Sequence, residues 1–457
     1  MRIVNPATGQ TLEEIGEDTR DSVAEKVARA RRGQRAWAQT PFPIRADHLR
    51  RFRDTIAERR EALALTLTSE VGKPLAQSRN ELGALGARID FFLDHTGPEI
   101  EDEIVAAAVA GGTEERIRHE PLGVVANVSA WNYPFFVGAN VFVPALLTGN
   151  SVLYKPSEYA TLTGLGIEQA LYDSGVPHDA FVSVIGGGSV GAALIEQRVD
   201  GVFFTGSHAT GARIAQALAH RMIRLQLELG GKDPAYVCDD VDPKQAAAAT
   251  ADGAFYNTGQ SCCAVERVYV HESIWDPFVR EFTAVVKAFV LGDPTDPDTY
   301  IGPLARRELA LATLEDQIAD ALRRGAKLLT GGRKADRPGF FFEPTVLVDV
   351  THDMLVMRDE SFGPVIGLMK VPSDVAAREL MADTEYGLTA AVYSASRTRA
   401  EAILSELDVG TAYWNCCDRV SPRLPWSGRG HSGIGCTLSS YGIEAFTKPK
   451  AYHLRAG

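Results

Sequence analysis

The spacing of apolar residues predicts that about the first hundred residues of the chain are helical. One apolar stripe contains Val23 and Val27, and a second contains Leu49 and Phe52. Each stripe repeats at the period of one helix face. Gly72, followed by lysine and proline, is a stop signal for the second of these helices. We interpret both stripes as surfaces that pack into a core.

From about residue 120, short β-rich runs alternate with segments rich in alanine and leucine. The first group of runs is Leu122–Val128, Ser151–Tyr154, Phe181–Ile185 and Gly201–Phe204. The second group is Ala235–Val237, Val265–Val270, Val365–Leu368, Ala390–Tyr393 and Thr411–Trp414. This alternation predicts an α/β fold with two lobes of mostly parallel sheet. The boundary is expected at the flexible stretch Leu229-Gly-Gly-Lys.

The composition argues against several classes of partner. A net charge of −12, from 47 basic and 59 acidic residues, disfavours nucleic acid and anionic membranes. No apolar run approaches the ~20 residues of a membrane span. The six cysteines and the histidines lack the spacing of a disulfide framework or a metal site. We therefore expect a cytoplasmic protein with no bound metal.

The turns that follow the first strands carry polar residues where ligands bind in parallel sheets. Asn132 offers an amide donor that would stabilise an oxyanion. Lys155 and Glu158 are placed to bind ribose hydroxyls, and a carboxylate there repels a 2′-phosphate. Gly206 and Ser207 precede a predicted helix whose amides suit a pyrophosphate, although the Gly-x-Gly-x-x-Gly fingerprint is absent at this turn. Taken alone, each signal is weak. A buried aromatic pair with a turn is the alternative at Asn132, and a surface turn is by itself the favoured explanation of Lys155 and Glu158.

Two cysteines, Cys262 and Cys263, stand side by side before a strand-like run, and Glu228 lies beside a glycine pair. A thiolate attacks carbonyl carbons, and it needs an oxyanion donor and a base for water. Asn132, Glu228 and one cysteine are such a set. The ordinary alternative is a solvated glutamate with cysteines that act as small buried hydrophobes. The residue types alone do not choose between the two cysteines.

Together these motifs resemble the aldehyde dehydrogenase superfamily. The match extends from Asn5-Pro-Ala-Thr-Gly9 nearly to the C-terminus, with the motifs in the expected order. The motifs are Trp131-Asn-Tyr-Pro, Lys155-Pro-Ser-Glu, Phe204-Thr-Gly-Ser, Glu228-Leu-Gly-Gly-Lys, Gly259-Gln-Ser-Cys and Glu360-Ser-Phe-Gly-Pro364. Each motif is weak by itself, whereas the ordered set is highly specific.

The resemblance implies a non-phosphorylating oxidation of an aldehyde to a carboxylic acid. It identifies Cys262 as the nucleophile, since this residue lies two positions after the Gly-Gln glutamine, and it makes Cys263 a packing neighbour. Asn132 and the Cys262 backbone amide would hold the oxyanion. The thiohemiacetal would then pass a hydride to the nicotinamide. Glu228 would activate the water that hydrolyses the resulting thioester.

The resemblance also implies NAD as the cofactor, with NADP possible. By similarity, Lys155 and Glu158 hold the adenosine ribose, and Ser207 holds the pyrophosphate. Glu360 would hold the nicotinamide ribose. The remaining cofactor-binding residues that the motifs supply are Trp131, Gly206, Gly230 and Phe362.

The implied fold has three parts. Residues 1–101 and 122–228 would form a Rossmann-like NAD-binding domain, and residues 229–435 an α/β catalytic domain. Residues 102–121 and 436–457 would form a small β element for bridging and oligomerisation. Relatives use that element to build homodimers or homotetramers.

Some positions depart from the family pattern. A lysine and a glutamate that many relatives use as a proton relay correspond here to Val141 and Thr437. Two alternatives to the leading hypothesis are a CoA-acylating enzyme and a non-catalytic NAD-binding member of the family. Glu228 argues against the first, because the resemblance implies that CoA-acylating relatives usually lack this base. Cys262, Glu228 and Asn132 together argue against the second. Cys416 and Cys417 lie where relatives build the substrate pocket, with packing as an equal alternative.

The substrate aldehyde is expected to be apolar or aromatic. Phe135, Phe136 and Trp414 lie near the motifs that carry the resemblance. No arginine stands out in the sequence as an anchor for a second carboxylate, which disfavours dicarboxylic semialdehydes.

Overall fold

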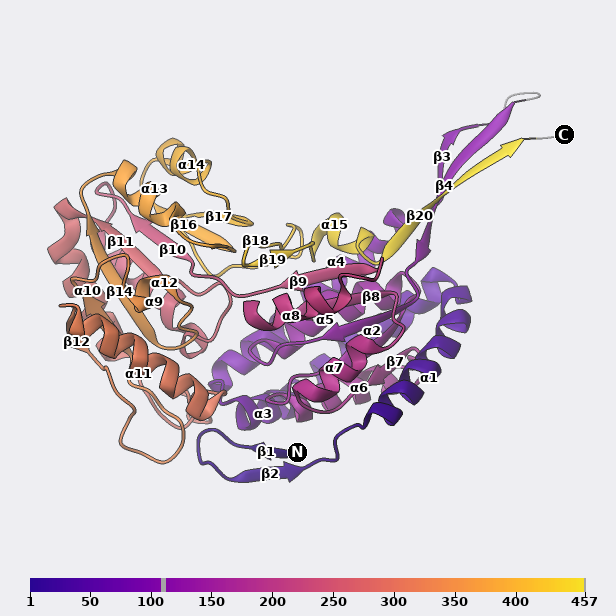
Figure 1. Cartoon of the computed structure of the whole chain (residues 1–457), viewed down its shortest axis with the longest axis horizontal. Coiled ribbons are helices and arrows are strands. Elements are labelled where there is room, and N and C mark those ends of the chain that lie inside the picture. Colours follow the sequence, from indigo (N-terminus) through magenta and orange to yellow (C-terminus); the bar gives the residue numbers. More distant parts are fainter. Residues whose placement is uncertain (108–111, 456–457) are drawn as a thin grey trace.

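The computed structural model describes residues 1–107 and 112–455. The first lobe is built around a six-stranded sheet (Figure 1). The strand order is β19-β9-β8-β5-β6-β7, in which all pairs are parallel except β19 with β9. The strands are β5 (Val124–Val128), β6 (Ser151–Lys155), β7 (Phe181–Ser183), β8 (Gly201–Thr205), β9 (Arg224–Glu228) and β19 (Gly433–Ile434). The chain starts at β5 and winds outward in both directions, so the sheet has a switch point between β5 and β8 where ligands bind.

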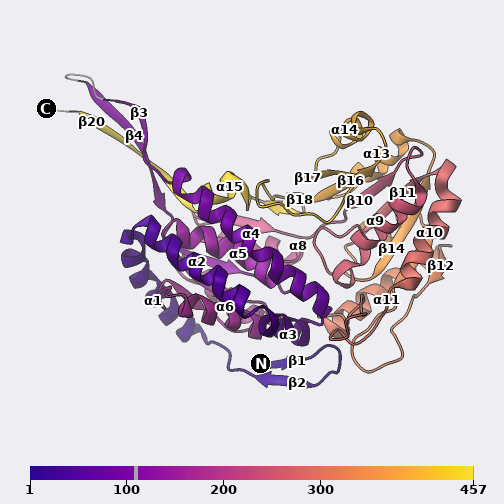
Figure 2. The same ribbon diagram turned by 180° about the vertical axis from the view of Figure 1, so that it is seen from behind.

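Helices cover both faces of this sheet, which explains why its central strands are almost continuously apolar and buried. One face carries α1 (Arg20–Gln39), α7 (Gly188–Glu196) and α8 (His208–Leu218). The other carries α5 (Pro134–Leu147) and α6 (Thr161–Asp173), with α2 (Phe42–Glu58), α3 (Arg60–Val71) and α4 (Leu75–Glu99) outside them (Figure 2).

The expected second N-terminal helix is in fact two helices, α2 and α3. The helix is interrupted at Arg59, between Glu58 and Arg60, where the sequence has no proline or glycine. Gly72, with φ 85°, ends α3 rather than the second helix. A left-handed glycine at this position is a common helix terminator.

The second lobe contains a seven-stranded sheet in the order β12-β13-β14-β11-β10-β16-β17. Its strands are β10 (Pro234–Val237), β11 (Arg267–His271), β12 (Lys327–Thr330), β13 (Thr345–Val348), β14 (Val365–Val371), β16 (Thr389–Tyr393) and β17 (Thr411–Trp414). Helices α9 (Pro243–Phe255) and α10 (Trp275–Ala288) pack on one face. The other face packs against α11 (Arg307–Arg323), α12 (Leu355–Arg358), α13 (Asp374–Ala382) and α14 (Arg397–Leu404).

A three-stranded antiparallel arm projects from the first lobe (Figure 1). It consists of β3 (Glu103–Ala106), β4 (Thr113–Pro121) and β20 (Thr447–Arg455), with β4 in the centre. Residues 108–111 and 456–457 of the expected bridging element lie outside the described residues. The smaller elements are β1 (Arg2–Val4), β2 (Thr11–Glu14), β15 (Tyr386–Gly387), β18 (Arg429–Gly430) and α15 (Ser439–Glu444).

Strand register brings the ends of four strands together at one edge of the first sheet. Val128 of β5 pairs with Lys155 of β6 and with Phe204 of β8. Thr205 of β8 pairs with Glu228 of β9. Because parallel strands end on the same side, the turns after them converge on one place. Four of the turns identified in the sequence therefore meet there.

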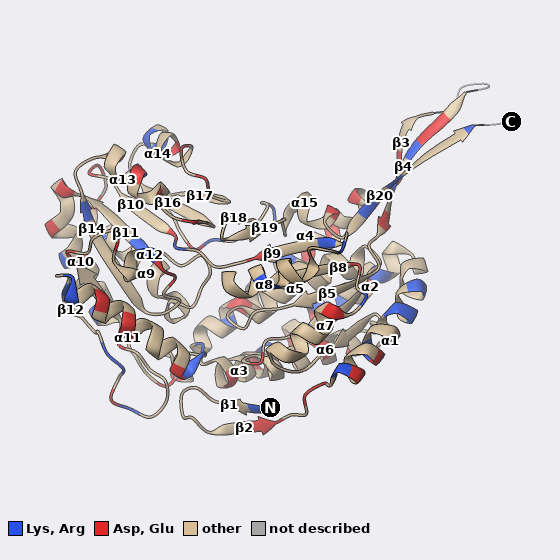
Figure 3. Ribbon diagram, in the orientation of Figure 1, with Lys and Arg blue, Asp and Glu red and all other residues tan. Residues whose placement is uncertain are grey.

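Charged residues are dispersed over the surface in both signs. Figure 3 shows both basic and acidic segments on α1 and α11, as expected for solvated helix faces. Across residues 1–107 and 112–455, no helix is both long and apolar enough to cross a membrane. The same residues contain no cluster of three histidine, cysteine or acidic side chains able to hold a metal ion.

Candidate active site

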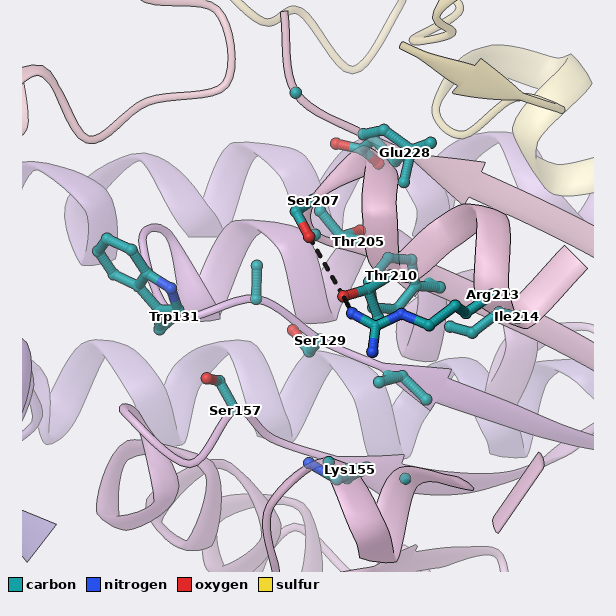
Figure 4. Close-up of a pocket in the computed structure, with 18 of the residues that line it drawn as sticks. Ser129, Trp131, Lys155, Ser157, Thr205, Ser207, Thr210, Arg213, Ile214 and Glu228 are labelled. Atoms are coloured by element: carbon teal, nitrogen blue, oxygen red, sulfur yellow. Dashed lines mark hydrogen bonds between the residues drawn. The ribbon is translucent and has the colours of Figure 1, made fainter. Parts of the chain in front are cut away.

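One cavity of about 730 Å³ lies beyond these strand ends (Figure 4). Residues from both lobes line it, with Glu228 on the first sheet and Arg306 just before α11. The cavity collects every site residue expected from the sequence: Trp131, Asn132, Lys155, Glu158, Gly206, Ser207, Glu228, Gly230, Cys262, Glu360 and Phe362. Residues far apart in the sequence are thus brought into one space.

The two adjacent cysteines occupy different environments. Cys262 lines the cavity and is half-buried. Cys263 is only 3% exposed, and its Sγ donates to Asp418 Oδ1 at 3.0 Å. The hydrogen bond with the Cys262 thiol, burial and the neighbouring Asp418 together raise the pKa of Cys263 well above its ordinary value. A buried thiol next to a carboxylate is a poor source of thiolate, so Cys262 is the better nucleophile of the pair.

The backbone before the cysteines is held in an unusual conformation. Asn257 and Thr258 have φ of 53° and 61°, and Gly259 follows with φ 70°. Left-handed backbone costs free energy for residues with a Cβ, so such a run persists only where packing enforces it. A Cβ on Gly259 would overlap the carbonyl oxygen of Gly363. The cysteine loop is therefore pressed against the turn that contains Glu360.

The Asn257 side chain ties the cysteine loop to the Asn132 turn. Its Nδ2 donates to the Asn132 carbonyl at 3.2 Å and to the Gln260 carbonyl at 2.9 Å. Asn132 is 4% exposed, and among the described residues its own side-chain amide has no hydrogen-bond partner. The donor is thus positioned through its backbone, while its amide remains available to a ligand oxygen in the cavity.

Glu228, the last residue of β9, is a buried carboxylate held by two donors. It is 4% exposed, Trp426 Nε1 donates to its Oε1 at 2.8 Å, and Thr437 Oγ1 donates to its Oε2 at 3.4 Å. Burial raises the pKa of Glu228 to about 7, although both donors and the charge of Arg88 act in the opposite direction. A carboxyl group that titrates near neutrality suits a general base.

The positions of the missing proton relay have different roles here. Val141 is buried within α5 at 1% exposure, and its side chain has no ionisable group that could relay a proton. Thr437, by contrast, contacts the Glu228 carboxylate directly. Together with Trp426, it gives Glu228 two hydrogen-bond donors from the C-terminal segment of the chain.

The start of α8 is suited to an anionic group. Ser207 is the N-cap of this helix, but its hydroxyl bonds Thr210 Oγ1 at 3.2 Å rather than a helix amide. The first amides of the helix therefore keep their capacity for a phosphate. Lys155 is buried at the end of β6, where burial lowers its pKa, and Glu158 lies half-buried in the following turn.

A buried ion pair supports the Glu360–Phe362 turn on the opposite wall. Lys232 Nζ donates to Glu266 Oε2 at 2.6 Å, and Glu266 also accepts from the backbone amides of Ser361 and Phe362 at 2.8 and 2.9 Å. Glu360 Oε1 accepts from the Gly231 amide at 3.2 Å. The Phe362 ring packs edge-on against Trp131, with centroids 5.5 Å apart.

Gly230 lies against this turn, and its lack of a side chain is required. A Cβ at this position would overlap the Glu360 carboxylate. The glycine therefore permits the close approach of the two lobes beside the cavity.

Several supporting residues carry no signal that sequence reasoning could use. Trp426 and Thr437 reach Glu228 across about 200 residues of chain, and Arg88 acts on it from α4. Asn257 gave a weak signal, because asparagine tolerates left-handed backbone better than most residues. The remaining supports, Lys232 and Glu266, are recognisable only once the lobes are folded.

The aromatic and cysteine residues considered for the substrate side are dispersed. Phe135 is fully buried, and the Trp414 indole donates to the Ser394 carbonyl. Phe136 is partly buried against the same core cluster as Cys262. Cys416 and Cys417 pack against the core between the second sheet and α9. The structure thus gives these two cysteines a packing role.

Comparison with known proteins identifies the class of protein that this fold and cavity define. The model of the aldehyde dehydrogenase family matches residues 1–452. The chain is 36% identical to a succinate-semialdehyde dehydrogenase [NADP(+)] of Deinococcus radiodurans, over 98% of this chain and 93% of that protein. It is 35% identical to a betaine aldehyde dehydrogenase of Cereibacter sphaeroides, over 100% of this chain and 94% of the relative.

Solved structures agree with these relatives. A 3,6-anhydro-L-galactose dehydrogenase in complex with NAP superposes with a TM-score of 0.95 at 34% identity, covering 100% of this chain and 96% of that one. Lactaldehyde dehydrogenase from Escherichia coli gives a TM-score of 0.95 at 31% identity, with the same two coverages. The chain therefore belongs to the aldehyde dehydrogenase family, which confirms the resemblance and the fold class expected from the sequence.

Proposed function

We propose that this protein oxidises an aldehyde to its carboxylic acid with a nicotinamide cofactor, through a thioester on Cys262. The observation that carries the proposal is the meeting of Cys262, Asn132 and Glu228 in one cavity with the turns suited to a dinucleotide. A nucleophile, an oxyanion donor and a base are the groups that acyl transfer to water requires.

Each residue has a distinct chemical task. The Cys262 thiolate forms a bond to the aldehyde carbonyl carbon. The Asn132 side-chain amide and the Cys262 backbone amide donate to the resulting oxyanion. A bound nicotinamide cofactor supplies the hydride acceptor that converts the thiohemiacetal to a thioester. Glu228 in its ionised form then takes a proton from water, whose oxygen attacks the thioester, releases the acid and restores the Cys262 thiol.

The cavity residues fit such a cofactor. We propose that the α8 amides and Ser207, with Gly206, hold the pyrophosphate, and that Lys155 and Glu158 hold the adenosine ribose. Glu360 would bind the nicotinamide ribose, with Trp131, Gly230 and Phe362 bordering the ring. One relative is named with NADP(+), and one of the similar solved structures is a complex with NAP. The similar structure of a betaine aldehyde dehydrogenase from Staphylococcus aureus is a complex with NAD+. We propose NAD as the cofactor, with NADP also accepted.

Turnover by the purified protein tests this proposal. NADH and NADPH formation would be measured over aliphatic, aromatic, cationic and semialdehyde substrates, with the acid quantified and CoA omitted. Acid formation without CoA supports hydrolysis by Glu228. Cofactor reduction that depends on CoA would favour the acylating alternative. Binding of NAD without any turnover would favour a non-catalytic member of the family.

The same panel tests the expected substrate class. We propose an apolar or aromatic aldehyde, because Phe136 packs in the same cluster as Cys262. Higher kcat/KM for benzaldehyde or a medium-chain aldehyde than for succinic semialdehyde would support this. A clear preference for succinic semialdehyde would contradict it.

The pH profile depends on the donors to Glu228. Trp426→Phe removes the N–H that bonds the carboxylate, and this donor favours the charged form. Its loss raises the pKa of Glu228 further, by about one pH unit for a hydrogen bond to a charged group. We expect the acidic limb of the kcat profile to move to higher pH by that amount. Stopped measurements of acid production from pH 5 to 9 check it, and an unshifted limb would contradict the assignment.

We also propose the three-part organisation expected from the sequence, with cofactor binding in residues 1–101 and 122–228 and the nucleophile in residues 229–435. The arm would make the protein a homodimer or homotetramer in the cytoplasm. Ile104, Val105 and Leu454 on the arm are exposed apolar side chains, which a second copy would cover. Light scattering of the purified protein tests the assembly.

A further inference from the structure

The outer end of the cavity is a slot between α7 and α8. Ala192 and Ile195 of α7 line one side, and Ile214 and Ala217 of α8 line the other. Apolar walls of this kind suit the faces of a purine ring. If the proposed function holds, this slot would receive the adenosine half of the cofactor, and Lys155 and Glu158 line the same cavity.

Arg213 lies beside the slot and lines the same cavity. Figure 4 shows the guanidinium turned into the cavity beside Thr210. Its Nε donates to the Ala209 carbonyl at 3.1 Å, and Nη2 lies 3.5 Å from Thr210 Oγ1. Within residues 1–107 and 112–455, no carboxylate lies within ion-pairing distance of it. Glu196, the acidic residue of α7 that lines the slot, is paired with Arg20 instead.

A second arginine of the same cavity makes the contrast clear. Arg221 directs its guanidinium at the carbonyls of Ile195, Gln197 and Val199, at 2.8 to 2.9 Å. These bonds use its donors to hold the chain together, so it serves the fold. Arg213 has only one well-formed bond of this kind and retains a fork of donors, which is the geometry that binds phosphate oxygens.

We propose that Arg213 binds the 2′-phosphate of NADP, so that the enzyme uses both NADP and NAD. In dinucleotide sites a carboxylate favours the free 2′-hydroxyl, whereas a nearby arginine accommodates the 2′-phosphate. This chain has both groups in one cavity, Glu158 from the β6 turn and Arg213 from α8. Glu158 serves NAD, and Arg213 with Lys155 offsets its repulsion of the phosphate.

Binding of two fragments that differ only by the 2′-phosphate tests this directly. Calorimetry with 2′,5′-ADP and 5′-AMP would be run on the intact wild-type protein, Arg213→Ala and Arg213→Lys. We expect Arg213→Ala to weaken 2′,5′-ADP by about tenfold or more, as for the loss of a charged hydrogen bond. Its affinity for 5′-AMP is expected to change less than twofold, and Arg213→Lys to retain part of the phosphate contact.

Arg198→Ala is the matched control. Arg198 is exposed and lies outside the cavity, and its substitution changes the net charge by the same amount as Arg213→Ala. It should leave both affinities unchanged. If Arg213→Ala loses affinity for 2′,5′-ADP and 5′-AMP to the same extent, the proposal is overturned, and Arg213 stacks on the adenine instead. If Arg198→Ala loses as much affinity for 2′,5′-ADP as Arg213→Ala does, the proposal is also overturned, because general charge attraction explains the effect. Unchanged 2′,5′-ADP binding would also overturn it. NAD-dependent aldehyde oxidation by the wild type is measured separately, so failure here is distinguishable from failure of the proposed function.

Discussion

Cys262→Ala is expected to lose aldehyde oxidation by more than about a thousandfold, because no other group in the cavity replaces a covalent nucleophile. Cys263→Ala, in contrast, should keep its activity within about tenfold. Only the first of the two side chains lines the cavity, whereas the second is buried against Asp418. Initial rates of NADH formation on both variants provide the measurement.

Folding must be controlled in this comparison. Removal of the Cys263 thiol deprives Asp418 of one donor, although Ser261 Oγ still bonds the same oxygen at 3.1 Å. We therefore expect Cys263→Ala to lower the melting temperature more than Cys262→Ala does. A folded but inactive Cys263→Ala, beside an active Cys262→Ala, would show that the motif has been assigned to the wrong cysteine.

Glu228→Gln is expected to separate the two halves of the reaction. Thioester formation needs Cys262 and Asn132, whereas its hydrolysis needs a base for water. The variant should release one NADH per active site in a rapid burst and then turn over about a hundredfold to ten-thousandfold more slowly, the usual contribution of a general base. Rapid-mixing absorbance at low pH and at neutral pH would resolve the burst.

Glutamine keeps the shape of the side chain. Its one oxygen can still accept from Trp426 Nε1, and its NH2 group can donate to Thr437 Oγ1, because a hydroxyl oxygen also accepts. Asn132→Ala is the informative companion, because it should slow the burst itself. A full-rate steady state in Glu228→Gln would contradict the role of base.

Burial raises the pKa of Glu228 in the wild-type protein to about 7. We therefore expect hydrolysis by the wild-type enzyme to slow as pH falls below 7 and Glu228 becomes protonated.

Much of this architecture was predictable because the strands are short apolar runs with turn residues after them. The ends of β5, β6 and β8 carry the expected motifs, and parallel pairing brings those ends to one edge. Four strands of the two sheets, β9, β12, β13 and β19, were not predicted. In β9, Arg224-Leu-Gln-Leu-Glu mixes polar and apolar positions. The edge strand β19 has only two residues.

The residues that position the site were less predictable than those that line it. Motifs name Cys262 and Glu228 because their chemistry restricts the residue type. Trp426 could serve many purposes in a chain, and its role appears only when the C-terminal segment packs against β9. Similarly, the motifs did not point to Arg213, because position within a helix does not reveal which side chains face a cavity.

The most direct test of the central claim is to locate the acyl group. Glu228→Gln would be mixed with an aldehyde substrate and NAD, quenched in acid and analysed by mass spectrometry, with fragmentation of the peptide that contains both cysteines. The proposed mechanism predicts an added acyl group, equal to the aldehyde less one hydrogen, that replaces the thiol hydrogen of Cys262. An acyl group on Cys263, or NADH release with both cysteines unmodified from the burst onward, would contradict it.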